Sequence, residues 1–367
     1  MFLKSLGFDR LRKHTKRPYP TVIEELCHQF SLADLRKATN NFDQNNVIRE
    51  RICPKVIVYR GCLQLDHVAT AVVVKQMSVK LGVEEMKREI ELLCQLRHPN
   101  LISLIGFCIH KDDICTVFKY MSNGFLSDHL FKRDDHDREP LSWKKRLEIC
   151  IGVARGVHYL HTGLKRIIIH REIYPNNILL DENMVPKLSD FRHSLQGPLF
   201  TTESKPIEGS VYPLAGMPGF MAPEQFNFRN RHYTVVTTDK CDVYSFGMVL
   251  CEVVCAEPIY TIIKEKEKID YYNKKAPSIS IRSYIMSRLR AGEINLALVG
   301  KIAPESYEVF INIIERCLKY SWNERPAMGE VEVELERSLT LQLEADTRDT
   351  RHDYLTSITQ PQQQEST

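Results

Sequence analysis

The chain has 367 residues, of which 43% are hydrophobic and 26% charged, and its formal net charge is +3. This length allows one large two-lobed domain or two ordinary domains, and the composition is typical of a soluble globular protein. The small net charge argues against nucleic acid as the default partner. Eleven cysteines without a CxxC pair or a zinc-ligand spacing favour reduced, mostly buried thiols in the cytosol.

The two ends of the chain differ from its middle. Residues 1–30 form a basic tail without a long apolar run, so no signal peptide is expected, and Phe2 excludes N-myristoylation. The basic charges favour a solvated tail over an electrostatic membrane contact. Residues 343–367 are polar and rich in Gln, and we expect a disordered tail there. No run approaches the roughly 18 to 20 apolar residues that cross a bilayer.

Residues 31–121 predict a short helix followed by a small β-rich lobe. Ser31 and Asp34 form a capping signature, which predicts a helix within 31–44 that leads into the domain. Over 45–121 we expect antiparallel strands and one amphipathic helix. The strand-like runs are 56–61, 68–75, 101–109 and 115–121, with a turn near 63–67, and the helix covers 83–96.

Residues 122–342 predict long helices. Apolar stretches indicate helices at 142–163, 241–257 and 307–321, and a last one after residue 328. A small β-rich lobe followed by a larger helical lobe is an α+β, two-lobed arrangement.

Four polar residues stand where phosphoryl-transfer chemistry would need them. Lys75 ends an apolar strand and could pair with nucleotide phosphates, although an ordinary exposed lysine is the alternative. Glu89 lies on the apolar stripe of the next helix, where a carboxylate is costly unless a cation such as Lys75 meets it. Asn177 has the spacing of a metal ligand in a catalytic loop, and Asp190 follows a short strand where a second metal ligand belongs. Each signal is weak alone.

The motifs together resemble those of protein kinases. The resemblance covers about residues 45–340 and includes Ala222-Pro223-Glu224 and the sequence DVYSFG from residue 242. The stretches LRHPNLISLIGFC and YMSNGFLSDHL are similar, more narrowly, to plant receptor-like cytoplasmic kinases. The resemblance places Glu172 at the proton-acceptor position. It also implies that ATP and Mg²⁺ are the ligands of the four residues Lys75, Glu89, Asn177 and Asp190.

The resemblance also implies structural roles. Glu224 would pair with Arg325, and Asp242 would order the catalytic loop. Phe118 would lie at the back of the nucleotide pocket, and residues 119–121 would form the hinge. The residues with an implied structural role are His170, Arg171, Glu224, Asp242 and Arg325.

Two departures from the kinase pattern affect nucleotide binding. The stretch 49–58 lacks the glycines that let backbone N–H groups close on phosphates, and Pro54 removes a further donor. Arg192 follows Asp190-Phe191 where a Gly is usual, which brings a cation beside the metal position.

Three further departures affect the substrate side. Glu172 replaces an Asp and has a longer arm, and a displacement of about 1 Å can cost roughly a hundredfold in rate. Tyr174 replaces a Lys that would neutralise charge on the transferred phosphate. Met217 replaces a Thr in the substrate-docking loop. We therefore expect a kinase fold retained for something other than turnover.

This set of losses resembles the ZED-related (ZRK) subfamily, whose members include pseudokinase adaptors of plant immunity. The resemblance implies two partners, an NLR-type immune receptor and a related receptor-like cytoplasmic kinase, with ATP and Mg²⁺ bound weakly or not at all. It implies a cytoplasmic location, with the inner face of the plasma membrane as an alternative. Two other functions stay open: an active serine/threonine kinase with an atypical Glu172, and a nucleotide-binding switch without turnover.

The segment 192–220 is a candidate interaction surface. Its hydroxyl groups are either phosphorylation or docking sites or simply those of a solvated loop. They belong to Thr201, Thr202, Ser204, Ser210 and Tyr212.

Overall fold

The computed structural model describes residues 27–51, 56–78, 83–110, 113–131, 139–200, 204–207, 216–226, 228–229, 232–233, 236–272, 280–294 and 296–359. The chain divides into two compact units. Unit 1 comprises Met1–Asn123, Asp181–Asn183 and Ser189–Ser194, and unit 2 comprises Gly124–Leu180, Met184–Leu188 and Leu195–Thr367. Relative to the expected lobes, unit 1 also takes in the segment before residue 45 and two short segments from later in the chain.

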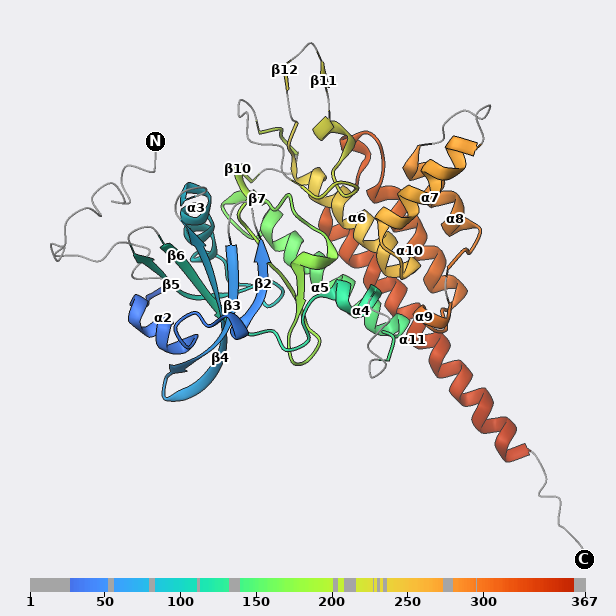
Figure 1. The fold of residues 1–367 in the computed structure, drawn as a ribbon. Coiled ribbons are helices and arrows are strands. Elements are labelled where there is room, and N and C mark those ends of the chain that lie inside the picture. The colour runs from blue at the N-terminus through green and yellow to red at the C-terminus, as the bar shows by residue number, and fades with distance from the viewer. Residues whose placement is uncertain are drawn as a thin grey trace, which may run out of the picture. The chain divides into compact units, whose positions relative to one another are not determined.

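A six-stranded sheet forms unit 1, in the order β1-β5-β6-β4-β3-β2 (Figure 1). Neighbouring strands are antiparallel except β1, which pairs with β5 in parallel. Asp66 and His67 alone make the β3–β4 turn, both with positive φ, so most of the turn expected at 63–67 is strand. The strands are β1 His28–Gln29, β2 Val47–Arg51, β3 Val56–Leu65, β4 Val68–Ser78, β5 Leu104–His110 and β6 Asp113–Lys119.

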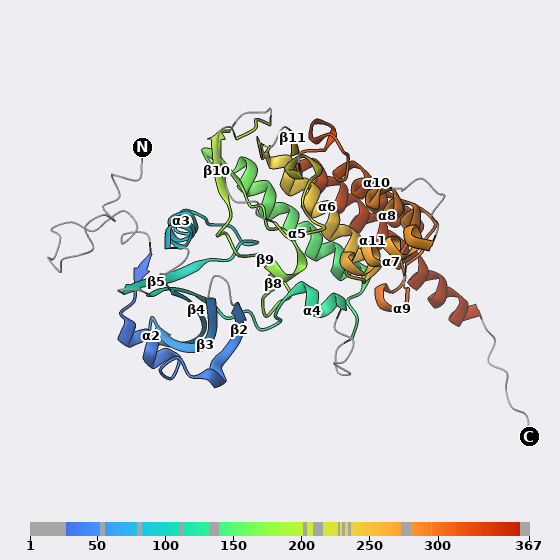
Figure 2. The same cartoon turned by 45° about the horizontal axis from the view of Figure 1, so that its top comes forward.

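Two helices lie on opposite faces of this sheet (Figure 2). Helix α2, Leu32–Ala38, begins with the predicted capping box, in which Ser31 and Asp34 bond reciprocally. Its Leu35 packs into a core with alternate residues of β4 and β6. Helix α3, Val83–Leu93, contacts β5 and β6. Because side chains alternate along a strand, Lys75 of β4 lies on the face opposite Val72 and Val74 of the α2 core.

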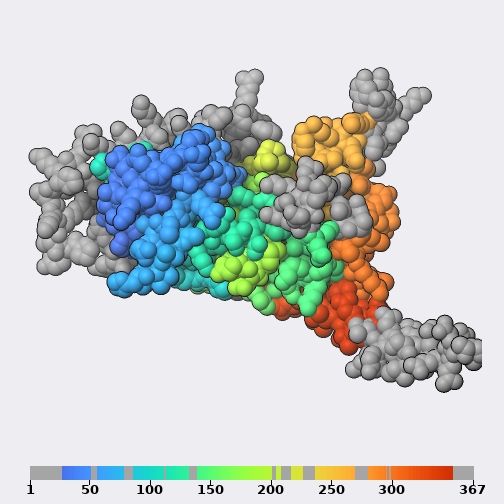
Figure 3. Space-filling view, turned by 60° about the horizontal axis from the view of Figure 1, so that its bottom comes forward, coloured from blue at the N-terminus to red at the C-terminus, as the bar shows by residue number. Residues whose placement is uncertain are grey.

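The segment before β3 is part of the surface of unit 1. In the space-filling view, residues from 27 to about 50, in dark blue, continue directly into the lighter blue strands that follow (Figure 3). The short helix η2, Gln44–Asn46, connects α2 to β2.

Unit 2 is mainly helical, with two long helices, α5 and α6, whose side chains are mostly buried. Helix α5 contacts α6, α11 and the strands β7 and β9. The predicted α+β arrangement, a β-sheet lobe and a helical lobe, is confirmed. The elements are α4 Leu126–Phe131, α5 Trp143–Thr162, β7 Arg166–Ile169, η3 Pro175–Asn177, β8 Ile178–Leu180, β9 Pro186–Leu188, β10 Leu195–Leu199, η4 Pro223–Phe226, β11 Phe228–Arg229, β12 His232–Tyr233, α6 Asp239–Cys255, α7 Ile259–Tyr272, α8 Ile281–Arg290, α9 Leu296–Val299, α10 Pro304–Cys317, η5 Trp322–Glu324 and α11 Met328–Thr359.

Helix α11 extends past residue 343, where we expected a disordered tail to begin. Its residues up to Gln342 are packed in part, and the Ala303 N–H donates to Gln342 Oε1 at 2.8 Å. Between residues 343 and 349 the side chains are exposed or half-buried. Residue 343 therefore marks the end of packing, and the helix itself continues to Thr359.

Among the described residues, no single helix is long and apolar enough to cross a membrane. Residues Asp239–Cys255 and Ile259–Lys268 meet that test only as a pair, bent by 84°.

Candidate active site

Lys75 and Glu89 form a buried ion pair in unit 1. Lys75 Nζ donates to both carboxylate oxygens of Glu89 at 2.9 Å, and the Glu89 side chain is 1% exposed. Met86 and Leu93, which flank Glu89 on the helix, are completely buried. Burial raises the pKa of the Glu89 carboxyl, and the Lys75 cation acts in the opposite direction. The cation expected to meet Glu89 is therefore Lys75.

Asp190 joins this pair through the segment Ser189–Ser194 of unit 1. Lys75 Nζ lies 3.4 Å from Asp190 Oδ1, and the Phe191 N–H donates to Glu89 Oε1 at 3.3 Å. Asp190 has a φ of 64°, in the left-handed region that, apart from glycine, mainly asparagine and aspartate residues adopt. The segment thus contains a residue with left-handed backbone next to the Lys75–Glu89 pair.

Arg192 occupies both oxygens of Asp190. Its Nε donates to Oδ1 and its Nη2 to Oδ2, each at 2.7 Å. The Arg192 side chain is 5% exposed and the Asp190 side chain 21% exposed. This is the two-pronged geometry in which a guanidinium binds a carboxylate most strongly.

The fit of ATP and Mg²⁺ to unit 1 is mixed. Lys75, with its partner Glu89, has the placement of a lysine that pairs with nucleotide phosphates. Both Asp190 oxygens accept from the Arg192 guanidinium, so a divalent cation at Asp190 would compete with a positively charged group for the same carboxylate. No cluster of three or more His, Cys, Asp or Glu side chains among the described residues could hold a metal. Residues 52–55 of the expected phosphate loop, Pro54 included, lie outside the described residues.

Asp242 holds the backbone at His170 and Arg171 in unit 2, the stretch that the kinase resemblance assigns to the catalytic loop. The carboxylate is completely buried and accepts from the His170 N–H and the Arg171 N–H, both at 2.8 Å. His161 Nε2 of helix α5 lies 3.0 Å from the same carboxylate. Arg171 has a φ of 71°, so Asp242 stabilises a backbone turn that is otherwise unfavourable. We did not predict the contribution of His161, whose only signal is a polar residue among the apolar positions of a helix.

Further contacts hold the loop from within. The Glu172 N–H donates to His170 Nδ1 at 3.2 Å, and Asn177 Nδ2 donates to the Glu172 carbonyl oxygen at 3.0 Å. Glu172 is 8% exposed. The ring of Tyr174 lies 6.0 Å from the ring of Phe220, at an angle of 48°. The loop therefore has an ordered shape, and Tyr174 places an aromatic ring where the kinase pattern has a cation.

Arg325 and Glu224 form a second buried ion pair, in the interior of unit 2. Two N–H···O bonds of 2.7 Å join them, and the Arg325 side chain is completely buried. Arg325 also donates to the backbone carbonyls of Lys319, Tyr320 and Lys240. This is the pairing that the kinase resemblance implied, and its contacts are those of a structural residue.

Comparison with known proteins agrees with this geometry. The model of the protein tyrosine and serine/threonine kinase family matches residues 56–290. The chain belongs to this family. Among its relatives in Arabidopsis thaliana, the receptor-like protein kinase ANXUR2 is 41% identical over 88% of this chain and 35% of its own length. The receptor-like protein kinase FERONIA is 40% identical over 88% of this chain and 33% of its own length. The chain thus spans about a third of each relative. A kinase domain implies ATP and Mg²⁺ as ligands in general.

The structure describes some of the other residues to which the kinase resemblance assigns a role. Phe118 is nearly buried on β6, where it pairs with Val73 and Leu104. In the expected hinge, the Tyr120 N–H donates to the Ala71 carbonyl oxygen at 3.0 Å. Met217 is exposed. Of the five hydroxyl residues expected in segment 192–220, Ser204 is described, and Thr201, Thr202, Ser210 and Tyr212 lie outside the described residues.

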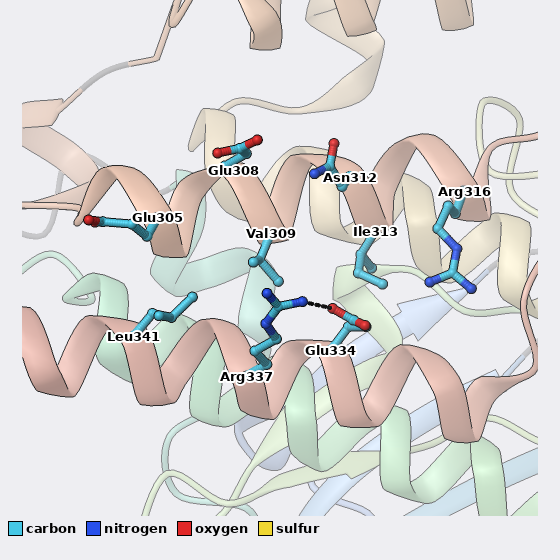
Figure 4. Close-up of a pocket in the computed structure, with 9 residues that line it drawn as sticks. All are labelled: Glu305, Glu308, Val309, Asn312, Ile313, Arg316, Glu334, Arg337 and Leu341. Carbon is cyan, nitrogen blue, oxygen red and sulfur yellow. Dashed lines mark hydrogen bonds and ion pairs between the residues drawn. The ribbon is translucent and has the colours of Figure 1, made fainter.

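A surface groove of unit 2 lies between α10 and α11, and none of the predicted site residues lines it (Figure 4). Two of its charged residues, Arg337 and Glu334, pair with each other on α11, and a third, Arg316 of α10, pairs with Glu330, which lies outside the lining. Val309, Ile313 and Leu341 line it between the helices. We interpret it as the seam between two packed helices.

Proposed function

We propose that this kinase-family chain is a pseudokinase adaptor of the ZRK type, which acts in plant immune signalling. In this proposal it binds an NLR-type immune receptor and a related receptor-like cytoplasmic kinase in the cytoplasm or at the inner face of the plasma membrane. The observation that carries the proposal is the catalytic loop. Asp242 holds the backbone of the loop, while Glu172 and Tyr174 stand at the two positions that should act on substrate and phosphate.

The chemistry of phosphoryl transfer explains why these two changes matter. An enzyme accelerates this reaction almost entirely by positioning the groups and by stabilising charge. Tyr174 is uncharged and packs near Phe220, so it supplies no cation to the transferred phosphate. Glu172 is one methylene longer than the usual Asp, and its backbone N–H and carbonyl are both tied within the loop. Its carboxylate therefore cannot regain the position of an aspartate through a shift of the loop backbone.

An active serine/threonine kinase is the second candidate. The relatives ANXUR2 and FERONIA are named as protein kinases, and the Lys75–Glu89 pair is intact. In this alternative Glu172 still orients the substrate hydroxyl, so Glu172→Asp should raise the rate. A nucleotide-binding switch without turnover is the third candidate, supported by the placement of Lys75 alone. It requires that Mg-ATP raise the melting temperature of wild-type protein and not of Lys75→Ala.

The test is phosphate transfer from radiolabelled ATP to the chain itself and to a general protein substrate. We expect wild-type protein to incorporate no more label than Asp190→Ala. The double variant Glu172→Asp/Tyr174→Lys serves as the matched gain-of-function comparison. If wild-type protein turned over at the rate of an ordinary kinase and Asp190→Ala abolished that activity, the adaptor proposal would be wrong.

The adaptor role has its own test. Co-precipitation from plant extracts with a coiled-coil NLR and a related cytoplasmic kinase should succeed equally in the absence and in the presence of added Mg-ATP. Binding that required added ATP would contradict an adaptor that works without nucleotide.

A further inference from the structure

Four charged side chains form one connected network in unit 1. Lys75 bonds to Glu89 and lies within ion-pair distance of Asp190, and Asp190 bonds to Arg192. Within these contacts two cations meet two carboxylates, so their charges balance. All four side chains are mostly buried: the exposed fraction is 13% for Lys75, 1% for Glu89, 21% for Asp190 and 5% for Arg192.

Neutrality matters because these groups have little access to water. A buried carboxylate with no compensating cation is strongly unfavourable, which is why buried charges are paired. In a kinase with glycine at position 192, Lys75 would be the only cation for two carboxylates. A divalent cation would then compensate Asp190. Here the Arg192 guanidinium supplies that charge from within the chain, over two bonds of 2.7 Å.

The local backbone favours this arrangement. Asp190 adopts a φ of 64°, and the Ser194 N–H donates to the Phe191 carbonyl oxygen at 3.1 Å, which closes a turn over 191–194. Arg192 lies within this turn, two residues after the carboxylate that it binds. The Phe191 N–H is tied to Glu89 of α3. The turn, the carboxylate and helix α3 are thus connected by direct bonds.

We propose that Arg192 is a resident counter-ion of Asp190, which occupies the coordination position of a divalent cation and keeps the Lys75–Glu89–Asp190 network assembled without metal or nucleotide. This inference rests on the proposed function, since it explains how the nucleotide side of a pseudokinase adaptor stays ordered with no ligand. A metal ion can bind Asp190 only after the guanidinium is displaced.

The test measures Mn²⁺ binding to the full chain by electron paramagnetic resonance, with Mn²⁺ alone and with a non-hydrolysable ATP analogue. Wild-type protein and Asp190→Asn should give the same titration. Arg192→Gln, which keeps a side chain of similar size, and Arg192→Gly should bind Mn²⁺ more tightly by about tenfold or more, because the charge-assisted pair no longer competes. The gain should vanish in Arg192→Gln/Asp190→Asn.

A second measurement follows folding. In metal-free buffer the melting temperature of Arg192→Gln should fall below that of wild type, and Mn²⁺ with the ATP analogue should restore it only in the variant. If Arg192→Gln does not fold, Arg192→Lys provides the test. It keeps the charge but not the two-pronged geometry, and should show a Mn²⁺ affinity between those of wild type and Arg192→Gly.

Two results would overturn the counter-ion role: Asp190-dependent Mn²⁺ binding by wild-type protein as tight as that of the variants, or folded variants with no gain in binding. Neither result affects the adaptor proposal, which depends on phosphate transfer. If wild-type protein bound Mn²⁺ through Asp190 but transferred no phosphate, only the counter-ion role of Arg192 would be refuted. Efficient phosphate transfer would refute the adaptor.

Discussion

At the scale of single residues, Asp242 connects three parts of unit 2. It lies in the first turn of α6, where the helix dipole favours a carboxylate, and it contacts the backbone of His170 and Arg171 and the side chain of His161. All of these contacts are buried. One side chain thus accepts the hydrogen bonds of two buried backbone N–H groups in a loop that has no strand pairing at that point.

Asp242→Asn should destabilise the protein by about 2 to 4 kcal/mol. The oxygen of the asparagine can still accept a hydrogen bond from one backbone N–H group. Its NH₂ group, itself a donor, would face the other backbone N–H group and could not bond to it. Urea unfolding followed by circular dichroism measures the effect. The same change at Asp66, in the exposed β3–β4 turn, is the matched control and should leave stability nearly unchanged. Equal stabilities of the two variants would contradict the role of Asp242.

At the scale of elements, a buried carboxylate joins α6 to α7. Glu252 is 3% exposed, and its Oε1 accepts from the Ile259 N–H at the start of α7, at 2.7 Å. Burial raises the pKa of this carboxyl from its usual value near 4.5 to about 8, and the bond from Ile259 acts in the opposite direction. The neutral acid is therefore the form that the folded protein prefers.

This pKa predicts a fall in stability with rising pH. Between pH 4.5 and 8 the folded protein holds a proton on Glu252 that the unfolded chain releases, so its contribution is full below pH 4.5 and is lost by about pH 8. The loss is on the order of 5 kcal/mol. Glu252→Gln keeps an acceptor for Ile259 and should remove this slope from urea unfolding measured across the range. The exposed Glu308→Gln should keep the slope, and an unchanged slope in Glu252→Gln would contradict the assignment.

The pairing of β1 with β5 depends on a glycine. A Cβ on Gly106 would lie 2.3 Å from the His28 carbonyl oxygen and 2.6 Å from the Phe30 ring, so the two strands approach each other only because position 106 has no side chain. The Phe30 N–H donates to the Phe107 carbonyl oxygen at 2.8 Å just beyond this contact.

Gly106→Ala should detach β1 and destabilise unit 1 by about 1 to 3 kcal/mol, because the backbone of β1 must move away. Hydrogen exchange at Phe30 is the direct measurement and should become faster. Gly197→Ala is the control on another strand, since its Cβ would have no contact shorter than 3.4 Å. Unchanged protection of Phe30 in Gly106→Ala would show that β1 tolerates the methyl group.

At the scale of the whole chain, segments outside the kinase-family match at 56–290 are packed onto each unit. Helix α2 covers one face of the sheet in unit 1, and α11 packs on α5 and α10 in unit 2. In unit 2 a buried chain of hydrogen bonds runs from Trp143 through Ser306 to Ser338 of α11. These extensions are thus part of the folded units.

Truncation separates the packed part of α11 from its exposed part. A chain that ends after residue 345 should melt within a few degrees of the full chain, because it loses mainly exposed contacts such as the Lys301–Asp349 pair, together with the bond from Gln342 Nε2 to Asp346. A chain that ends after Arg337 also loses the buried Ser338 and Gln342, and its melting temperature should fall by about 5 °C or more. Equal melting temperatures would mean that the last packed turns are dispensable.

Local patterns predicted much of this molecule from sequence. The capping residues of α2, the apolar stripe of α3 and the cost of an unpaired Glu89 were all visible, because they depend on spacing within a few residues. The two-lobed α+β order followed from the same patterns. The end of α11 could not be predicted from these patterns, since a polar helix that packs on one side only has the composition of a tail.

The sequence by itself determined which chemical groups the kinase fold retains and which it has lost, because residue types at fixed spacing are readable without coordinates. Only the tertiary structure decided what the remaining charges do. Arg192 and Asp190 are two residues apart, and a left-handed backbone at Asp190 turns that short separation into a two-pronged ion pair. Likewise, Asp242 and His161 meet across 81 residues of chain because α5 and α6 pack together. Backbone conformation and packing over long separations leave no periodic signal, so the structure had to supply them.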